Sequence, residues 1–218
     1  MKMTPIFHIL SILIMPLSGF MMVSGFVDFV YNNQNWANFF ISATITLFVG
    51  MSVFLATRGH NDQNVDLRQA FVLTTMSWIT IAFFGSLPFY LSNINLNFTD
   101  SFFESMSGIT TTGSTILINI EASPPGILAW RSLLQWLGGI GVIVMAIAIF
   151  PMLSVGGMQL FKAENFENPE KVVPRATSLT RGIFIIYSVL TLIWASLLYF
   201  CNDYSFCWNV SISSNKRT

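Results

Sequence analysis

The chain contains five long apolar stretches with almost no charge, and these constrain its fold more than any other feature. A helix rises about 1.5 Å per residue, so about 20 apolar residues cross a hydrocarbon layer about 30 Å thick. Only 9% of the residues are charged, against about 25% in soluble domains. The sequence therefore predicts an all-α membrane protein. The predicted spans cover residues 6–30, 39–57, 70–91, 127–153 and 182–201.

The positions of lysine and arginine predict how these spans are oriented. Most of them lie at the start of the chain or in two loops that share one side of the membrane if the spans alternate: Lys2, Arg58, Arg68, Lys162, Lys171, Arg175 and Arg181. Because cytoplasmic loops are enriched in basic residues, we expect this side and the N-terminus to be cytoplasmic. The opposite side has only Arg131 up to residue 201. Arg131 is either an interfacial anchor or the partner of an acid such as Glu121.

Between the third and fourth spans lies a half-apolar segment, residues 100–117, that is too short to cross the membrane. Its helix-forming positions, about ten, extend about 15 Å, or half of a hydrocarbon layer. Ser101 and Glu104 match the S-x-x-E capping box, which predicts a helix that begins at the outer surface. Gly108 is expected to loosen this helix. The pattern therefore predicts a re-entrant pore helix supported by Ser101, Glu104 and Gly108.

The short helix leads into Thr110, Thr111, Thr112, Gly113 and Ser114, which we expect to be extended. Carbonyl oxygens of such a segment can replace the water around a cation if they turn inward together. The partially negative C-terminal end of the helix would point to the same place. Gly113 can adopt a positive φ without steric cost. The favoured interpretation is a selectivity filter, and a threonine-rich turn on an outer loop is the alternative.

The fourth span contains small and polar residues that suit close contact with a neighbour. Gly138, Gly139 and Gly141 would allow another backbone to approach closely. Gln135 can hydrogen-bond the pore helix or its loop, or equally another span. Pro151 is expected to kink the inner end of this span.

The order of span, pore helix, TTTG and span, followed by QWLGGIGV and then PMLSVGG, resembles the Trk/Ktr/HKT superfamily of potassium transporters. Within that superfamily it is most similar to the bacterial TrkH/TrkG type of potassium-uptake subunit. The resemblance implies four successive span–pore–span units around one pore, each with a key glycine. It also implies ion coordination by the carbonyls of Thr110, Thr111, Thr112 and Gly113, with potassium at Thr111 and Thr112. The partners that it implies are a cytoplasmic nucleotide-binding regulatory subunit and a second copy of the subunit.

If the chain follows this pattern, we expect it to contain one complete unit of the four and a second unit that is truncated after its first span. The predicted segments are two extra N-terminal helices (1–60), the first unit (68–158), a cytoplasmic loop (159–181) and the truncated second unit (182–218). We therefore expect five transmembrane helices plus one re-entrant pore helix and filter loop. The predicted function is potassium transport, in an N-terminal fragment of a pore-forming subunit that is not competent alone.

Two alternatives remain open at this stage. One is a short cation channel assembled as a homotetramer, and the other is a non-conducting structural or interaction fragment in the membrane. Catalysis is not expected, because no nucleophile–base pair and no His, Glu and Asp cluster has catalytic or metal-ligand spacing. No basic run suggests nucleic acid, and no cofactor is expected apart from the transported potassium ion. The lipid bilayer is the remaining expected partner.

Overall fold

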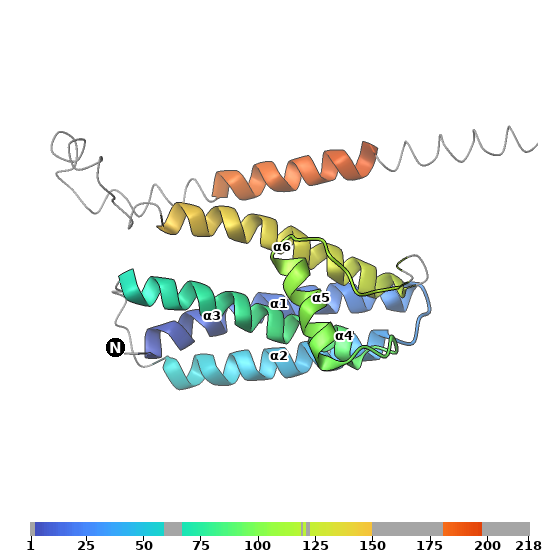
Figure 1. Ribbon diagram of the computed structural model, residues 1–218, viewed down its shortest axis with the longest axis horizontal. Helices are drawn as coiled ribbons and strands as arrows, with labels where there is room; N and C mark the ends of the chain where they lie inside the picture. The colour runs from blue at the N-terminus through green and yellow to red at the C-terminus, as the bar shows by residue number, and fades with distance from the viewer. Residues whose placement is uncertain (1–2, 59–66, 119, 121–122, 150–180, 198–218) are drawn as a thin grey trace, which may run out of the picture. The chain divides into compact units, whose positions relative to one another are not determined.

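The computed structural model describes residues 3–58, 67–118, 120, 123–149 and 181–197, and the regular secondary structure in these ranges is helical. The chain divides into two compact units, Met1–Met152 and Leu153–Thr218. In the first unit the helices are α1 (Thr4–Val30), α2 (Trp36–Thr57), α3 (Leu67–Gly85), α4 (Leu87–Leu91), α5 (Phe98–Ile109) and α6 (Pro125–Ile149) (Figure 1). In the second unit, residues 181–197 form one apolar helix.

Four of the predicted spans correspond to helices that are long and apolar enough to cross a membrane. They are Thr4–Val30, Trp36–Thr57, Gln69–Leu91 and Pro125–Ile143. The fifth predicted span corresponds to the shorter helix Arg181–Leu197. The predicted kink at Pro151, the predicted cytoplasmic loop 159–181 and the chain beyond residue 197 lie outside the described residues.

Small residues bring α1 and α2 into close contact. A Cβ added at Gly25 would come within 2.9 Å of the Cβ of Phe39, which is too close for a real Cβ. A Cβ added at Gly50 would be in ordinary contact with α1, at 3.4 Å from Cγ of Met15. Lipid tails are as apolar as side chains, so membrane helices associate through such close packing. Large apolar side chains lie on the outer faces of the pair, and Phe48 is 72% exposed. The pair thus has a tightly packed inner seam and an apolar outer surface suited to lipid.

The third predicted span is interrupted near its C-terminal end. α3 ends at Gly85 and α4 begins at Leu87. Pro88 lies in the first turn of α4, where it has no amide hydrogen to donate and its ring would clash with the carbonyl of a continuous helix. The Gly85 carbonyl accepts a hydrogen bond from Nε1 of Trp130 on α6, at 3.0 Å. The interruption therefore ties α3 to α6.

The short helix α5 begins one turn earlier than predicted, and the predicted capping box is wrong. Ser101 lies inside the helix, where its amide donates to the carbonyl of Asn97 at 2.9 Å. Its buried hydroxyl has no partner among the described residues. The Glu104 carboxylate binds the chain beyond the helix and not its start. Phe98 favours the earlier start, because its ring packs edge-on against that of Phe83 on α3.

α5 packs against both α3 and α6 near the middle of the first unit (Figure 1). Its 12 residues make it about 18 Å long. The chain after it returns to the end of the bundle where α6 begins (Figure 1). The buried apolar core around it consists of Leu17, Met21, Phe39, Ala43, Ala82, Phe89, Ile109, Leu117, Ile127, Trp130 and Leu134. α5 is therefore a short element held inside a bundle of much longer helices.

Candidate cation-binding site

The backbone directly after α5 folds back onto the end of that helix. The amides of Thr110, Thr111 and Thr112 donate, at 2.9, 3.0 and 3.1 Å, to carbonyl oxygens in the last turn of α5. Among the described residues, no hydrogen bond to the carbonyl oxygens of these three threonines is found, and all three residues are exposed. Within the described part of the chain, three successive carbonyl groups thus have no donor, at the partially negative end of a helix.

Hydroxyl groups and unusual backbone angles shape this turn. The Thr110 hydroxyl donates to the Met106 carbonyl at 2.8 Å, so the Thr112 hydroxyl, 2.8 Å away, is the donor between the two hydroxyls. Thr111 has φ 58°, a left-handed conformation that β-branched residues rarely adopt. Gly113 has φ 80°, which confirms the expected positive φ. The segment is not extended throughout, because Thr110 and Thr111 form a turn.

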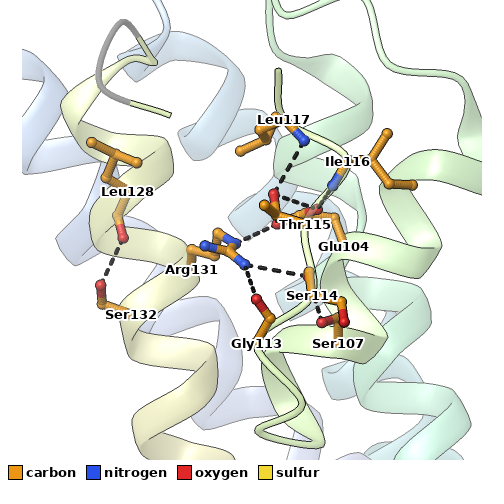
Figure 2. A network of polar contacts seen from close by, with 10 residues as sticks. All are labelled: Glu104, Ser107, Gly113, Ser114, Thr115, Ile116, Leu117, Leu128, Arg131 and Ser132. Carbon is orange, nitrogen blue, oxygen red and sulfur yellow. Dashed lines mark hydrogen bonds and ion pairs between the residues drawn. The ribbon is translucent and has the colours of Figure 1, made fainter. Parts of the chain in front are cut away.

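A buried ion pair holds the following part of the loop (Figure 2). Glu104 on α5 is fully buried and pairs with Nε of Arg131 on α6. The two carboxylate oxygens also accept hydrogen bonds from the Thr115 hydroxyl, at 3.0 and 3.1 Å, and one accepts from the amide of Ile116, at 3.0 Å. A buried charge is tolerated only when it is paired and hydrogen-bonded. Glu104 and the loop therefore hold each other in place.

Arg131 extends the same network to the carbonyl groups next to the threonines. Its Nη2 donates to the carbonyls of Gly113 and Ser114, at 3.2 and 3.3 Å (Figure 2). Ser107 on α5 donates to the Ser114 carbonyl as well, at 2.6 Å. The planar guanidinium has five donors, so it can serve a carboxylate and two carbonyls at once. The arginine therefore pairs with an acid, and that acid is Glu104; Glu121 lies outside the described residues.

Glycines on both helices allow α5 and α6 to approach closely. A Cβ at Gly138 would overlap the carbonyl of Ile109, the last residue of α5. This is the backbone contact that the sequence predicts for the glycines of this span, although Gly141 has open space around it. Gly108 does not loosen α5, because it lies within the helix, and a Cβ there would come within 3.1 Å of the Cβ of Leu134. The glycines set the spacing at which Arg131 reaches the loop.

The sequence does not predict the pairing of Glu104 with Arg131, nor the roles of Ser107 and Thr115. The two charges are 27 positions apart, and their contact depends on how α5 packs on α6. Glu104 itself indicated that such a partner exists, because a charged residue in a largely apolar membrane protein needs one. Asp28, a buried carboxylate within the first span, carries the same signal.

Membrane-length apolar helices around a short helix and a threonine loop define an all-helical membrane protein. A family model described as "TrkH: Cation transport protein" matches residues 35–217. The chain belongs to this family, which consists of transport proteins and not of enzymes.

Individual relatives agree with the family match. The chain is 41% identical over 198 residues to the Trk system potassium uptake protein TrkI of Halomonas elongata, covering 91% of this chain and 40% of that protein. It is 36% identical over 204 residues to the Trk system potassium uptake protein TrkH of Escherichia coli (strain K12), covering 92% of this chain and 42% of that protein. The crystal structure of the potassium transporter TrkH from Vibrio parahaemolyticus matches with a TM-score of 0.73 at 31% identity, over 88% of this chain and 38% of that one. The chain thus spans about 40% of the length of these relatives.

Proposed function

We propose that this chain contributes one filter segment, with its supporting helices, to a potassium ion pathway in the pore-forming subunit of a Trk-type uptake system. One observation carries this proposal. The amides of Thr110, Thr111 and Thr112 are all engaged by the end of α5, whereas no hydrogen bond to their carbonyl oxygens is found among the described residues. Carbonyl oxygens in this state can replace the hydration shell of a cation.

Potassium is proposed to bind at Thr111 and Thr112, with Thr110 and Gly113 completing the carbonyl ligands of this segment. The Gly113 carbonyl accepts a hydrogen bond from Arg131, and its second lone pair remains for an ion. The guanidinium charge is compensated by Glu104, so it does not repel the cation as a net charge. Carbonyl ligands surround an ion in a ring, so other filter segments must face this one.

The proposed topology has five spans and one re-entrant element. α5 is about 18 Å long, so it enters the membrane part of the way before the chain returns. α3 and α4 together form one span, and the helix at 181–197 is the fifth. The distribution of basic residues supports a cytoplasmic N-terminus in the inner membrane, with α5 entering from outside. The units of this arrangement are 1–60, 68–158, 159–181 and 182–218.

Two partners are proposed from the family resemblance. A nucleotide-binding regulatory subunit would act from the cytoplasmic side, where residues 159–181 are expected to lie. A second copy of the pore-forming subunit would give a homodimer. Both partners would bind the whole transporter. This chain spans about 40% of the length of the TrkI and TrkH relatives.

A chimera tests the proposal. The matched part of a full-length TrkH relative is replaced by this chain, and potassium uptake is measured in cells without uptake systems of their own. The unmodified chimera should restore growth at low potassium. Gly113→Ala should lower uptake at least about fivefold, because a left-handed backbone costs a residue with a Cβ about 1–2 kcal/mol. Gly19→Ala is the matched control, since nothing lies within 4 Å of its Cβ position either, and it lies in a regular helix.

Other outcomes would support the alternatives. Uptake by this chain expressed alone would favour the homotetrameric channel. A chimera that reaches the membrane but does not transport would favour the other alternative, a non-conducting interaction fragment. If Gly113→Ala lowers neither uptake nor the preference for potassium over sodium, the filter assignment is wrong.

A further inference from the structure

Asp28, near the end of α1, is a buried carboxylate that the proposed ion site does not use. Its side chain has no exposed surface, at 0%. Its Oδ1 accepts a hydrogen bond from the amide of Gly126, at 2.6 Å and 98 positions away. Its Oδ2 has no partner among the described residues. An ionisable group in a membrane helix is costly and by default marks a functional arrangement.

Gly126 fits this carboxylate in two ways. It is the second residue of α6, so its amide is among those that have no acceptor within the helix. Pro125 before it has no amide hydrogen, and the two amides after it donate to the carbonyl of Pro124. A Cβ at Gly126 would overlap the Asp28 carboxyl group. Asp28 therefore caps α6 from a different helix, with a side-chain oxygen that accepts from an amide in the first turn of α6.

The start of α6 also determines where Arg131 lies. Arg131 is roughly one and a half turns beyond Gly126 on the same helix. Its guanidinium binds the carbonyls of Gly113 and Ser114 as well as Glu104. The end of α1 and the start of α6 lie at the same end of the bundle (Figure 1). A shift of α6 along or about its axis would carry the guanidinium away from the loop.

We propose that Asp28 is a positioning residue for the threonine loop. It holds the start of α6 in place and, through Arg131, holds the carbonyls of Gly113 and Ser114. The first helix thereby stabilises the geometry in which the loop would bind an ion, and this part of the inference rests on the proposed function. Asp28 connects α1 with the loop through two contacts, Asp28 to Gly126 and Arg131 to the loop.

Amide hydrogen exchange of the purified chain in detergent tests this connection without requiring transport. Asp28→Ala should speed exchange about tenfold or more at the start of α6 and also in residues 110–117, which lie beyond Arg131 in this series of contacts. Asp28→Asn keeps an oxygen acceptor for Gly126 and should leave both segments as they are in the unmodified chain. Ser18→Ala is the matched control, because Ser18 is buried on α1 and its hydroxyl donates within α1, to the Met15 carbonyl at 2.7 Å.

Two results would overturn the proposal. Faster exchange confined to the start of α6 would make Asp28 a local cap, and unchanged exchange would give it no role in the packing of α6. If Asp28→Ala does not fold, Gly126→Ala provides the second test, because its Cβ displaces an intact carboxyl group. It should speed exchange in residues 110–117, and unchanged exchange there would contradict the proposal. Where both variants fold, the double variant should exchange more slowly than Gly126→Ala, since the missing carboxylate leaves room for the Cβ, and about as fast as Asp28→Ala, since both lack the cap.

The uptake chimera adds a functional measurement. Asp28→Ala should raise the potassium concentration for half-maximal uptake about threefold to tenfold, whereas Asp28→Asn and Ser18→Ala should not. An unchanged value for Asp28→Ala would count against a positioning role. If the unmodified chimera does not transport, the proposed function fails, and the exchange experiment still decides whether Asp28 positions the loop.

Discussion

At the scale of single residues, Glu104 and Arg131 decide how the loop is held. The carboxylate is fully buried, and the arginine side chain is only 13% exposed. Either charge alone would be strongly destabilising in such surroundings, whereas the pair compensates its own burial. The hydrogen bonds from Thr115 and Ile116 complete the surroundings of the carboxylate. The main effect of the pair is therefore to fix the relative positions of α5, α6 and the loop, because it joins all three at one point.

Removing the charge of Glu104 should destabilise the protein strongly. Glu104→Gln keeps the size of the side chain but leaves Arg131 without a counter-charge. Loss of one partner of a buried pair costs about 3–5 kcal/mol. We expect a clear decrease in the thermal unfolding temperature of the purified chain in detergent.

Asp100→Asn is the matched control for this substitution. Asp100 lies in the first turn of the same helix, where the helix dipole stabilises a negative charge by about 0.3–1 kcal/mol. The prediction would be contradicted if the two variants unfolded at the same temperature.

The sequence predicts the threonine loop at residue level but not its partners. Thr110 to Gly113 follow a short amphipathic segment directly, so their place depends on local sequence alone. The capping box at Ser101 and Glu104 is also a local pattern, and it fails because a stronger partner for the carboxylate lies 27 positions away. The left-handed Thr111 could not be predicted either, since a hydrogen bond from its amide back to Gly108 holds it there.

At the scale of helices, spans are predictable because length and apolar composition are local properties, and contacts between them are not. The prediction treats residues 70–91 as one span, whereas α3 and α4 are separated at Ser86. Pro88 was a visible reason for a break, but the bond from Trp130 to Gly85 depends on the packing of α6. Apolar composition alone does not say which helices are neighbours.

The contact of α5 with α6 provides a test at this scale. Gly138→Ala would place a Cβ on the carbonyl of Ile109, so the end of α5 must move away from α6. Overpacking of this kind costs about 1–3 kcal/mol. We expect lower thermal stability in detergent and lower uptake in the chimera. Gly141→Ala on the same helix has open space for its Cβ and should change neither, and a similar effect of both variants would contradict the close contact.

At the scale of the whole molecule, composition and motifs are enough to predict the membrane class and the family. The large exposed apolar surface, such as that around Phe48 and Phe26, agrees with a chain surrounded by lipid and by further protein. The link between α1 and α6 through Asp28 was not predictable, because a single acid in an apolar span does not identify its partner. The orientation of the bundle in the membrane is predicted only from the positions of the basic residues.

That direction can be tested with two positions at opposite ends of α2. Gln34 and Arg58 are both exposed, one before and one after this helix of 22 residues, which is about 33 Å long and can separate the two faces of a membrane. With Cys201 and Cys207 replaced by serine, Gln34→Cys should react with a membrane-impermeant maleimide in intact cells. Arg58→Cys should react only after permeabilisation, because we expect the basic side of the chain to face the cytoplasm. The reverse pattern would make α5 enter from the cytoplasm, so the threonine carbonyls would lie at the inner end of the ion path.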